Sequence, residues 1–450
     1  MIHCYKKGGF GCLFLLSKVK NDIHFYFSKV KNECKICFSK VKNRIFAARK
    51  QKTMDTLFKT YGRLLADTDL SFTRYLYDKI NWDNRLIVIK GAKGVGKTTL
   101  LLQHIKRTFA DAKKALYASL DHIWFANHTL LELAEYHYTH GGTHLFLDEV
   151  HKYKGWQQEI KNIYDSYPHL HIVVTGSSML KLEESLIADL SRRHRAYTME
   201  GLSFREYLKL EQVADLPVLP LQTILNNHFF EASQITLKVK VLQYFEKYIE
   251  SGYYPFYREE GDGFPDRLQQ VIDTVVTSEI PAVSHIEYDS VYKVKQLLAI
   301  LAETKPYTLN ISSLCTTLQS SRNNVLKLLD LMDKAALIRR LYATESGMNM
   351  LTKPEKILFY NTNLMYCLTP QVDSETMRET YLASQVSVNH RLYMPNKGDL
   401  VVDGKWLFEV GGKGKNFSQI KNIENSFVVS DNMEIGYGNK IPLWLFGLLY

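Results

Sequence analysis

The chain has 450 residues and a formal net charge of +10, from 57 Lys or Arg against 47 Asp or Glu. This length is enough for two or three domains, and no apolar run is long enough to span a bilayer, so we expect no membrane segment. A positive net charge is typical of nucleic-acid binders, but residues 1–53 alone hold 13 Lys or Arg against 2 Asp or Glu. The rest of the chain is close to neutral, which excludes a uniformly basic nucleic-acid-binding body.

The basic segment 1–53 is repetitive, because the pentapeptide Ser-Lys-Val-Lys-Asn at 17–21 recurs at 28–32 and 39–43 with a period of 11 residues. A right-handed helical supercoil has this period, but Lys-rich copies without helix caps fit it poorly. A basic amphipathic segment is a second interpretation. We favour a third, in which the repeat is translated repetitive DNA ahead of a natural start at Met54, and we do not expect a signal peptide.

Four of the six cysteines also lie in this tail. Cys34 and Cys37 have the spacing of half a zinc site, but the other two tail cysteines do not complete it. Only Cys315 and Cys367 belong to the rest of the chain. This usage predicts a reduced, cytoplasmic protein.

The segment 91–98 has the pattern of a phosphate-binding loop, with an apolar strand expected before it at 86–89 and a helix expected after it. Its glycines would turn backbone N–H groups toward a β-phosphate, and its lysine would reach the β- and γ-phosphate oxygens. The segment therefore predicts binding of ATP. The expected nucleotide-binding residues are Gly91, Ala92, Lys93, Gly94, Val95, Gly96, Lys97, Thr98 and Thr99.

A second buried strand is expected at 145–147, and it ends in two carboxylates, Asp148 and Glu149. In a chain with a phosphate loop, this pattern predicts a Walker B strand. Asp148 and the Thr98 hydroxyl would hold Mg²⁺, and Glu149 would polarise the attacking water.

A third strand, expected at 171–174, precedes the hydroxyl residues Thr175 and Ser177. They could hold the γ-phosphate or the water, and a plain strand-to-loop turn is an equal alternative. Downstream, Arg192 and Arg193 are candidates for neutralising charge on the γ-phosphoryl group, in cis or from a neighbouring copy in a homo-oligomer. A solvated basic turn, which also includes Arg195, is the other interpretation.

Helical patterns follow. A capping box at 203–206 opens one helix, a second is expected from about 237 to 249, and a third over 267–279. We expect these helices to form a lid. Further helices at 294–302, 311–318 and 321–334, followed by an apolar run at 336–338, suggest a winged-helix unit.

The winged-helix pattern carries few cations, chiefly Arg322 and Lys327. A partner-binding or structural role is therefore as plausible from the sequence as DNA binding.

Near the C-terminus, strands are expected at 400–402, 406–410 and 427–429. Asp399 and Glu409 resemble the acidic pair of PD-(D/E)xK nucleases, in which carboxylates bind Mg²⁺ and a lysine two residues after the second acid activates water. That position is Gly411, and Lys413 lies too far along an extended strand unless it reaches back from the glycine turn. We expect a degenerate domain that does not cleave DNA. Glu379 could be a further ligand, and Gln419 lies where such folds often carry a polar helix residue.

From residue 55 to residue 450, the chain resembles a prokaryotic family of AAA-type P-loop ATPases with a nuclease-like C-terminal domain of unknown function. The segments that carry the resemblance are 91–98, 147–152 with Trp156, 175–178, 189–193, 201–207, 408–413 and 441–447.

The resemblance and the motifs together predict an α/β protein with a P-loop NTPase parallel sheet. The expected parts are a basic tail at 1–53, the ATPase core at 54–208, a helical lid at 209–290, a winged-helix-like unit at 291–345 and a small nuclease-like α/β domain at 346–450. The leading hypothesis is a Mg²⁺-dependent ATPase that acts as a switch or motor on a DNA or protein partner. An ATP-dependent DNA endonuclease and a non-hydrolysing nucleotide-binding scaffold are the alternatives.

Overall fold

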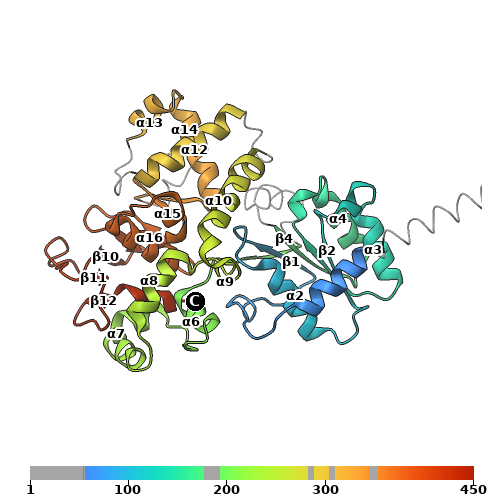
Figure 1. The fold of residues 1–450 in the computed structure, drawn as a ribbon, viewed down its shortest axis with the longest axis horizontal. Coiled ribbons are helices and arrows are strands. Elements are labelled where there is room, and N and C mark those ends of the chain that lie inside the picture. Colours follow the sequence, from blue (N-terminus) through green and yellow to red (C-terminus); the bar gives the residue numbers. More distant parts are fainter. Residues whose placement is uncertain (1–53, 55, 177–192, 282–287, 304–309, 344–352) are drawn as a thin grey trace, which may run out of the picture. The chain divides into compact units, whose positions relative to one another are not determined.

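The computed structural model describes residues 54, 56–176, 193–281, 288–303, 310–343 and 353–450. The chain divides into two units, residues 1–63 and residues 64–450, and the helices and strands labelled in Figure 1 belong to the second unit. The candidate residues Ser177 and Arg192 lie outside the described residues. Within the described part, no helix is both long and apolar enough to cross a membrane.

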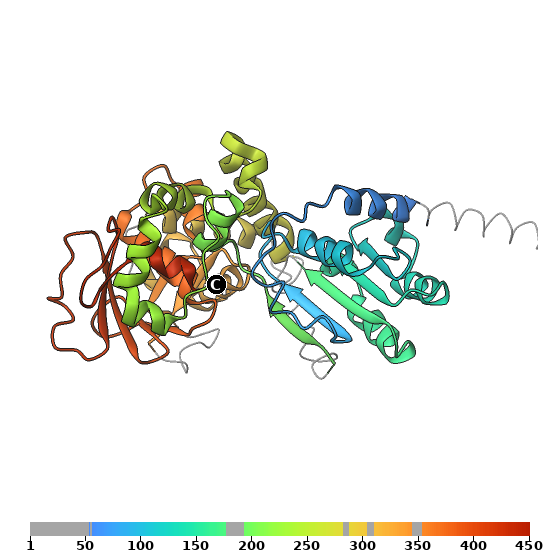
Figure 2. The same ribbon diagram turned by 90° about the horizontal axis from the view of Figure 1, so that it is seen from below.

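The N-terminal part of this unit is a five-stranded sheet made of β1 (Leu86–Lys90), β2 (Ala115–Ser119), β3 (His144–Asp148), β4 (His171–Gly176) and β5 (Arg195–Thr198). The strand order is β2-β3-β4-β1-β5, and all neighbours are parallel. Figure 2 shows these strands running side by side. Parallel strands need helical crossovers, and the helices here are α2 (Lys97–Thr108), α3 (Leu130–Thr139) and α4 (Trp156–Ser166). The predicted parallel P-loop sheet is confirmed.

Three helices follow the sheet. α6 (Phe204–Leu210) begins at the predicted capping box. The helix expected from about 237 to 249 begins later than predicted, because α7 (Leu221–Thr236) ends just before residue 237 and α8 spans Val241–Ser251. Leu237, which extended the apolar pattern, is 80% exposed between the two helices. α6, α7 and α8 pack into one core with the C-terminal sheet. The lid expected for residues 209–290 stays a prediction.

The next segment is nearly continuous helix. It consists of α9 (Tyr257–Glu260), a 3₁₀ turn (Gly261–Gly263), α10 (Phe264–Thr274) and a π-helical turn, η4 (Val275–Glu279). Figure 1 shows α10 beside α15 (Thr362–Leu368). The predicted helix at 267–279 is confirmed, with a change of helix type at residue 275.

The three helices expected after residue 291 are present as α12 (Tyr288–Glu303), α13 (Ile311–Thr317) and α14 (Arg322–Lys334). β6 (Ile338–Leu341) then pairs antiparallel with β7 (Lys356–Phe359). The expected domain boundary between residues 345 and 346 thus falls between two strands of one small sheet. The winged-helix assignment itself stays a prediction.

The C-terminal part holds α15, α16 (Ser374–Val386) and a mixed sheet of order β12-β11-β10-β9-β8. Its strands are β8 (Leu392–Tyr393), β9 (Leu400–Val402), β10 (Trp406–Gly411), β11 (Ser426–Ser430) and β12 (Lys440–Pro442). β10, β11 and β12 are parallel, and β8, β9 and β10 are antiparallel. A terminal 3₁₀ helix, Leu443–Leu448, is buried against α6, α7, α8 and α16.

Candidate nucleotide site

The phosphate loop joins β1 to α2 and takes the conformation that its glycines permit. Gly94 and Gly96 have φ of 86° and 97°, where residues with a Cβ are strained. At Gly91 a Cβ would lie 2.2 Å from the Met199 carbonyl oxygen, so the close approach of the two chain segments requires glycine there. Lys97, the first residue of α2, is buried, and its Nζ donates to the carbonyl oxygens of Gly91 at 2.9 Å and Ala92 at 2.8 Å.

Asp148, at the end of β3, gathers three hydroxyl groups. Thr98 Oγ1 donates to its Oδ2 at 2.6 Å, the Tyr117 hydroxyl donates to the same oxygen at 2.9 Å, and Thr175 Oγ1 donates to its Oδ1. Asp148 is only 2% exposed. The structure thus brings together residues from α2, β2, β3 and β4 around one carboxylate.

Tyr117 was not among the site residues predicted from the sequence. It lies on β2, opposite Phe146 in the register with β3 and two residues before the end of its strand. Burial and the adjacent Asp148 carboxylate raise the pKa of its hydroxyl, so it stays a proton donor at neutral pH. A polar residue near the end of a neighbouring parallel strand was the available signal.

Glu149 follows Asp148 in the left-handed region, with φ of 54°. Its Oε2 lies 3.5 Å from His151 Nε2, and its side chain is 25% exposed. This conformation turns Glu149 away from the strand direction, and the residue lines a cavity of about 340 Å³ next to the phosphate loop.

That cavity has two sides. The phosphate loop and Glu149 form one side, and α9 and α10 with the residue before them form the other. Its lining residues are Lys93, Gly94, Gly96, Lys97, Thr98, Thr99, Glu149, Phe256, Glu259, Glu260, Arg267 and Val271. The residues from Phe256 onward were not among the predicted site residues, because no local pattern links them to a loop that precedes them by more than 150 positions.

Arg74 is a second residue that the sequence did not indicate. Its guanidinium is buried and donates to the carbonyl oxygen of Val95 in the phosphate loop. It also donates to Glu206 Oε1 at 3.0 Å and to the carbonyl oxygen of Gly201 at 2.7 Å. Glu206 is the glutamate of the predicted capping box, so one carboxylate caps α6 and holds the arginine that fixes the loop.

Among the predicted arginines, Arg193 lies away from the cavity lining. Its Nε is 3.3 Å from Asp165 Oδ1 on α4. Arg195 is exposed on β5. The assignment of Arg192 and Arg193 to catalysis therefore stays a prediction. For Arg193 it would need a different conformation or an arginine from another copy of the chain.

The C-terminal acids form a separate cluster. Glu409 on β10 is fully buried, and its Oε1 lies 2.5 Å from Lys415 Nζ. In the amide orientation that satisfies both groups, Gln419 donates to the two Glu409 oxygens at 3.1 and 2.6 Å. Lys415 was not among the predicted residues, and it reaches Glu409 because the chain turns at Gly412. A Cβ on Gly411 would lie 2.7 Å from the Lys415 side chain, so glycine makes room for it.

The other C-terminal acids also have partners within the chain. Asp399 Oδ2 accepts from the Val410 backbone N–H at 2.7 Å, and Glu379 forms an ion pair with Lys356. Burial raises the pKa of Glu379 to about 7, although Lys356 acts in the opposite direction. Among the described residues, no group of three or more His, Cys, Asp and Glu side chains could hold a metal ion.

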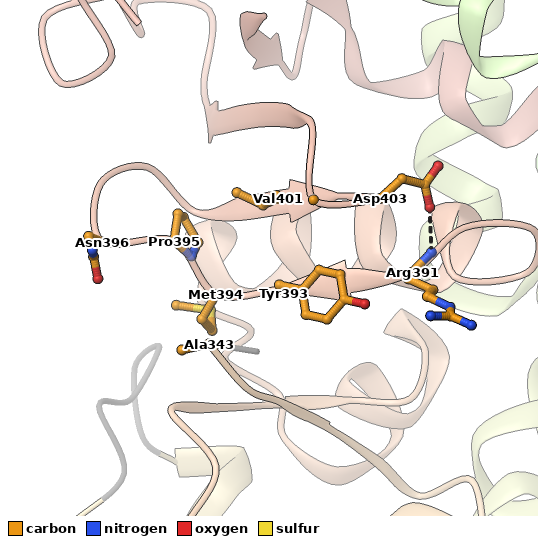
Figure 3. Close-up of a pocket in the computed structure, with 9 residues that line it drawn as sticks. Ala343, Arg391, Tyr393, Met394, Pro395, Asn396, Val401 and Asp403 are labelled. Carbon is orange, nitrogen blue, oxygen red and sulfur yellow. Dashed lines mark hydrogen bonds between the residues drawn. The ribbon is translucent and has the colours of Figure 1, made fainter. Parts of the chain in front are cut away.

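A larger cavity, of about 710 Å³, lies at β8 and β9, and Figure 3 shows its lining. Tyr393 and Val401 face each other across the paired strands, and Arg391 N donates to Asp403 Oδ1 at 2.9 Å. Its lining includes Arg391 and Asp403 but no residue of the phosphate-binding loop. Size alone therefore does not make it the functional site, and the chemistry points to the smaller cavity.

Comparisons with known proteins find two family matches and several similar proteins. Residues 83–208 match a family described as "AAA domain", and residues 242–375 match "Domain of unknown function (DUF8612)". An uncharacterized protein of Methanocaldococcus jannaschii is 28% identical over 324 residues, which is 66% of this chain and 68% of that protein. An uncharacterized protein of Haemophilus influenzae is 24% identical over 265 residues, or 56% of this chain and 60% of that protein.

Two solved structures are similar at low scores. A Walker-type ATPase of Pyrococcus abyssi has a TM-score of 0.41 and 14% identity, covering 66% of this chain and 95% of that one. AMPPCP-bound DnaA from Aquifex aeolicus has a TM-score of 0.23 and 15% identity, covering 58% and 84%. The family match and the strand order support an AAA-type P-loop fold for residues 83–208.

Proposed function

We propose that this chain binds ATP with Mg²⁺ at the phosphate loop and hydrolyses it. The carrying observation is that Thr98, which lines the 340 Å³ cavity beside Lys97, also donates to the buried Asp148 carboxylate. A hydroxyl and a carboxylate are the oxygen ligands that Mg²⁺ takes in phosphate sites, where substrate and water supply the rest. Thr98 and Asp148 would hold this ion, which when bound neutralises phosphate charge.

The chain's own groups then divide the work. Lys97 would exchange its two carbonyl partners for phosphate oxygens, which are stronger acceptors for an ammonium. Glu149, at the cavity wall, would orient and polarise the attacking water, and Thr175 would hold Asp148 in place from β4. Hydrolysis would serve a switch or motor whose partner binds the C-terminal parts.

The test separates binding from chemistry in one variant. Purified protein is titrated with ATP by calorimetry, and phosphate release is measured with and without Mg²⁺. Glu149→Gln should bind ATP like the parent protein and lose hydrolysis by about a hundredfold or more. Normal turnover in Glu149→Gln would reject its role, and absence of ATP binding by the parent protein would reject the whole proposal.

One observation favours a second candidate, phosphodiester cleavage by the C-terminal domain. Lys415 supplies at Glu409 the cation that the sequence placed out of reach. Against it, Lys415 occupies the carboxylate that a metal ion would need, and the described residues contain no three-ligand group. Incubation with supercoiled DNA in Mg²⁺ or Mn²⁺ tests this second activity. Cleavage that is lost in Glu409→Ala and retained in Glu149→Gln would establish the nuclease.

A further inference from the structure

α9 and α10 form most of the second side of the nucleotide cavity. Arg267 and Val271, which lie four residues apart on α10, share the helix face that lines it. Glu260, the last residue of α9, lines the same side.

One cation of the cavity lining is already paired with a carboxylate from this helical segment. Arg267 Nε lies 3.5 Å from Glu260 Oε1, and both residues line the cavity.

The charges along the cavity balance. Its lining includes the cations Lys93, Lys97 and Arg267 and the carboxylates Glu149, Glu259 and Glu260. A magnesium-bound triphosphate adds net negative charge to this balanced set. In a partly enclosed site, two anions that contact the same cation repel each other strongly. The incoming phosphates can pair with Arg267 only if Glu260 gives up part of its interaction with that cation.

We propose that ATP must displace one carboxylate of this chain, Glu260, from a cation of its own site, Arg267. Binding then changes the charge environment of α9 and α10. Because α10 packs against α15, this exchange gives the nucleotide a physical route to the C-terminal half. The inference rests on the ATP binding proposed above and adds the competing groups and the coupled element.

A double-mutant cycle on the exposed pair tests the competition. Glu260→Gln should tighten MgATP binding about threefold, the value expected of an exposed ion pair, and Arg267→Gln should weaken it. In the Arg267→Gln background, Glu260→Gln should give no gain, because the cation that Glu260 blocks is gone. Glu259→Gln is the matched control, since it removes the same charge from the same cavity lining without touching the Arg267 pair.

A gain from Glu260→Gln that persists in the Arg267→Gln background, or that Glu259→Gln equals, would be general repulsion and would overturn the inference. A parent protein that binds no ATP rejects the proposed function, whereas a binding parent with unchanged variants rejects only this inference.

Discussion

Two sites in this chain combine a lysine with a buried carboxylate, but one lysine is bonded to neutral backbone oxygens and the other to the carboxylate itself. At the phosphate loop, Lys97 Nζ is held by two backbone carbonyl oxygens, and Asp148 is held by hydroxyl groups. At the C-terminal sheet, Lys415 Nζ contacts Glu409 directly. At the phosphate loop, the charges of Lys97 and Asp148 have neutral partners and can exchange them for charged ones. At the C-terminal sheet, the charges of Lys415 and Glu409 already neutralise each other.

This difference explains what each site can do. Carbonyl oxygens and hydroxyls are neutral partners, which phosphate and Mg²⁺ can replace at modest cost. The charges of a buried ion pair have lost their hydration and are stabilised by their mutual attraction, so removing either charge leaves the other uncompensated. The loop is therefore suited to binding, and the Glu409 cluster to holding its part of the fold.

The strongest test of the comparison removes the phosphate-loop lysine. Lys97→Ala should weaken ATP binding by about two to three orders of magnitude, because a desolvated charged contact to phosphate is lost. Its effect on the unfolding free energy should be small, since its partners are carbonyl oxygens. Calorimetric titration and urea unfolding of the same preparation measure both. Lys93→Ala, on the same cavity lining, is the control, and equal losses in the two variants would remove the special role of Lys97.

The opposite pattern is expected at the C-terminal cluster. Lys415→Ala should lower the unfolding free energy by about 3 to 5 kcal/mol, because Glu409 is then buried without its cation, and it should leave ATP binding unchanged. Burial already raises the pKa of Glu409, so the loss should be larger at high pH than at low pH, where the carboxyl is protonated. Denaturant unfolding at several pH values measures this.

Lys413→Ala is the control for the C-terminal cluster, because Lys413 is exposed in the same loop and contributes its carbonyl oxygen, not its side chain, to the contact with Lys440. Equal destabilisation by Lys413→Ala and Lys415→Ala would show that the loop, rather than the ion pair, matters.

The sequence predicted what is local or set by parallel-sheet topology. The phosphate loop, the carboxylates after β3 and the capping box at Ser203 are encoded within a few residues, and the structure contains each of them. The pairing of Arg74 with Glu206 joins residues 132 positions apart, for which a single sequence holds no pattern.

Lys415 was missed for a different reason. The rule that side chains alternate along a strand holds only while the chain stays extended. Lys415 N donates a hydrogen bond to the Gly412 carbonyl oxygen, so the chain turns there and the rule no longer applies. The face of α10 was missed because apolar periodicity reports burial and not what a helix faces.

A pH experiment sharpens the comparison at Glu379. Its pKa in the folded protein is about 7, against an ordinary value of 4.5, so the folded state holds this proton to higher pH than the unfolded chain does. Stability from this group is fully present below about pH 4.5 and is lost as the pH rises toward 7, by about 3 kcal/mol. Glu379→Gln should flatten the fall in unfolding free energy across this window. An unchanged slope would show that Glu379 does not titrate there.

The smallest expected effect returns to the phosphate loop. Tyr117→Phe removes one of the hydroxyl groups that donate to Asp148 but leaves Thr98 and Thr175 in place. A single buried hydrogen bond contributes about 1 kcal/mol, so the Mg²⁺ concentration that half-activates hydrolysis should change by about fivefold, while ATP binding without Mg²⁺ stays unchanged. If Asp148 holds Mg²⁺, losing a competing donor lowers that concentration, whereas losing a group that only orients the carboxylate raises it. Phosphate release measured across a magnesium titration gives the sign, and an equal change in metal-free ATP binding would show that Tyr117 acts through the fold of the loop instead.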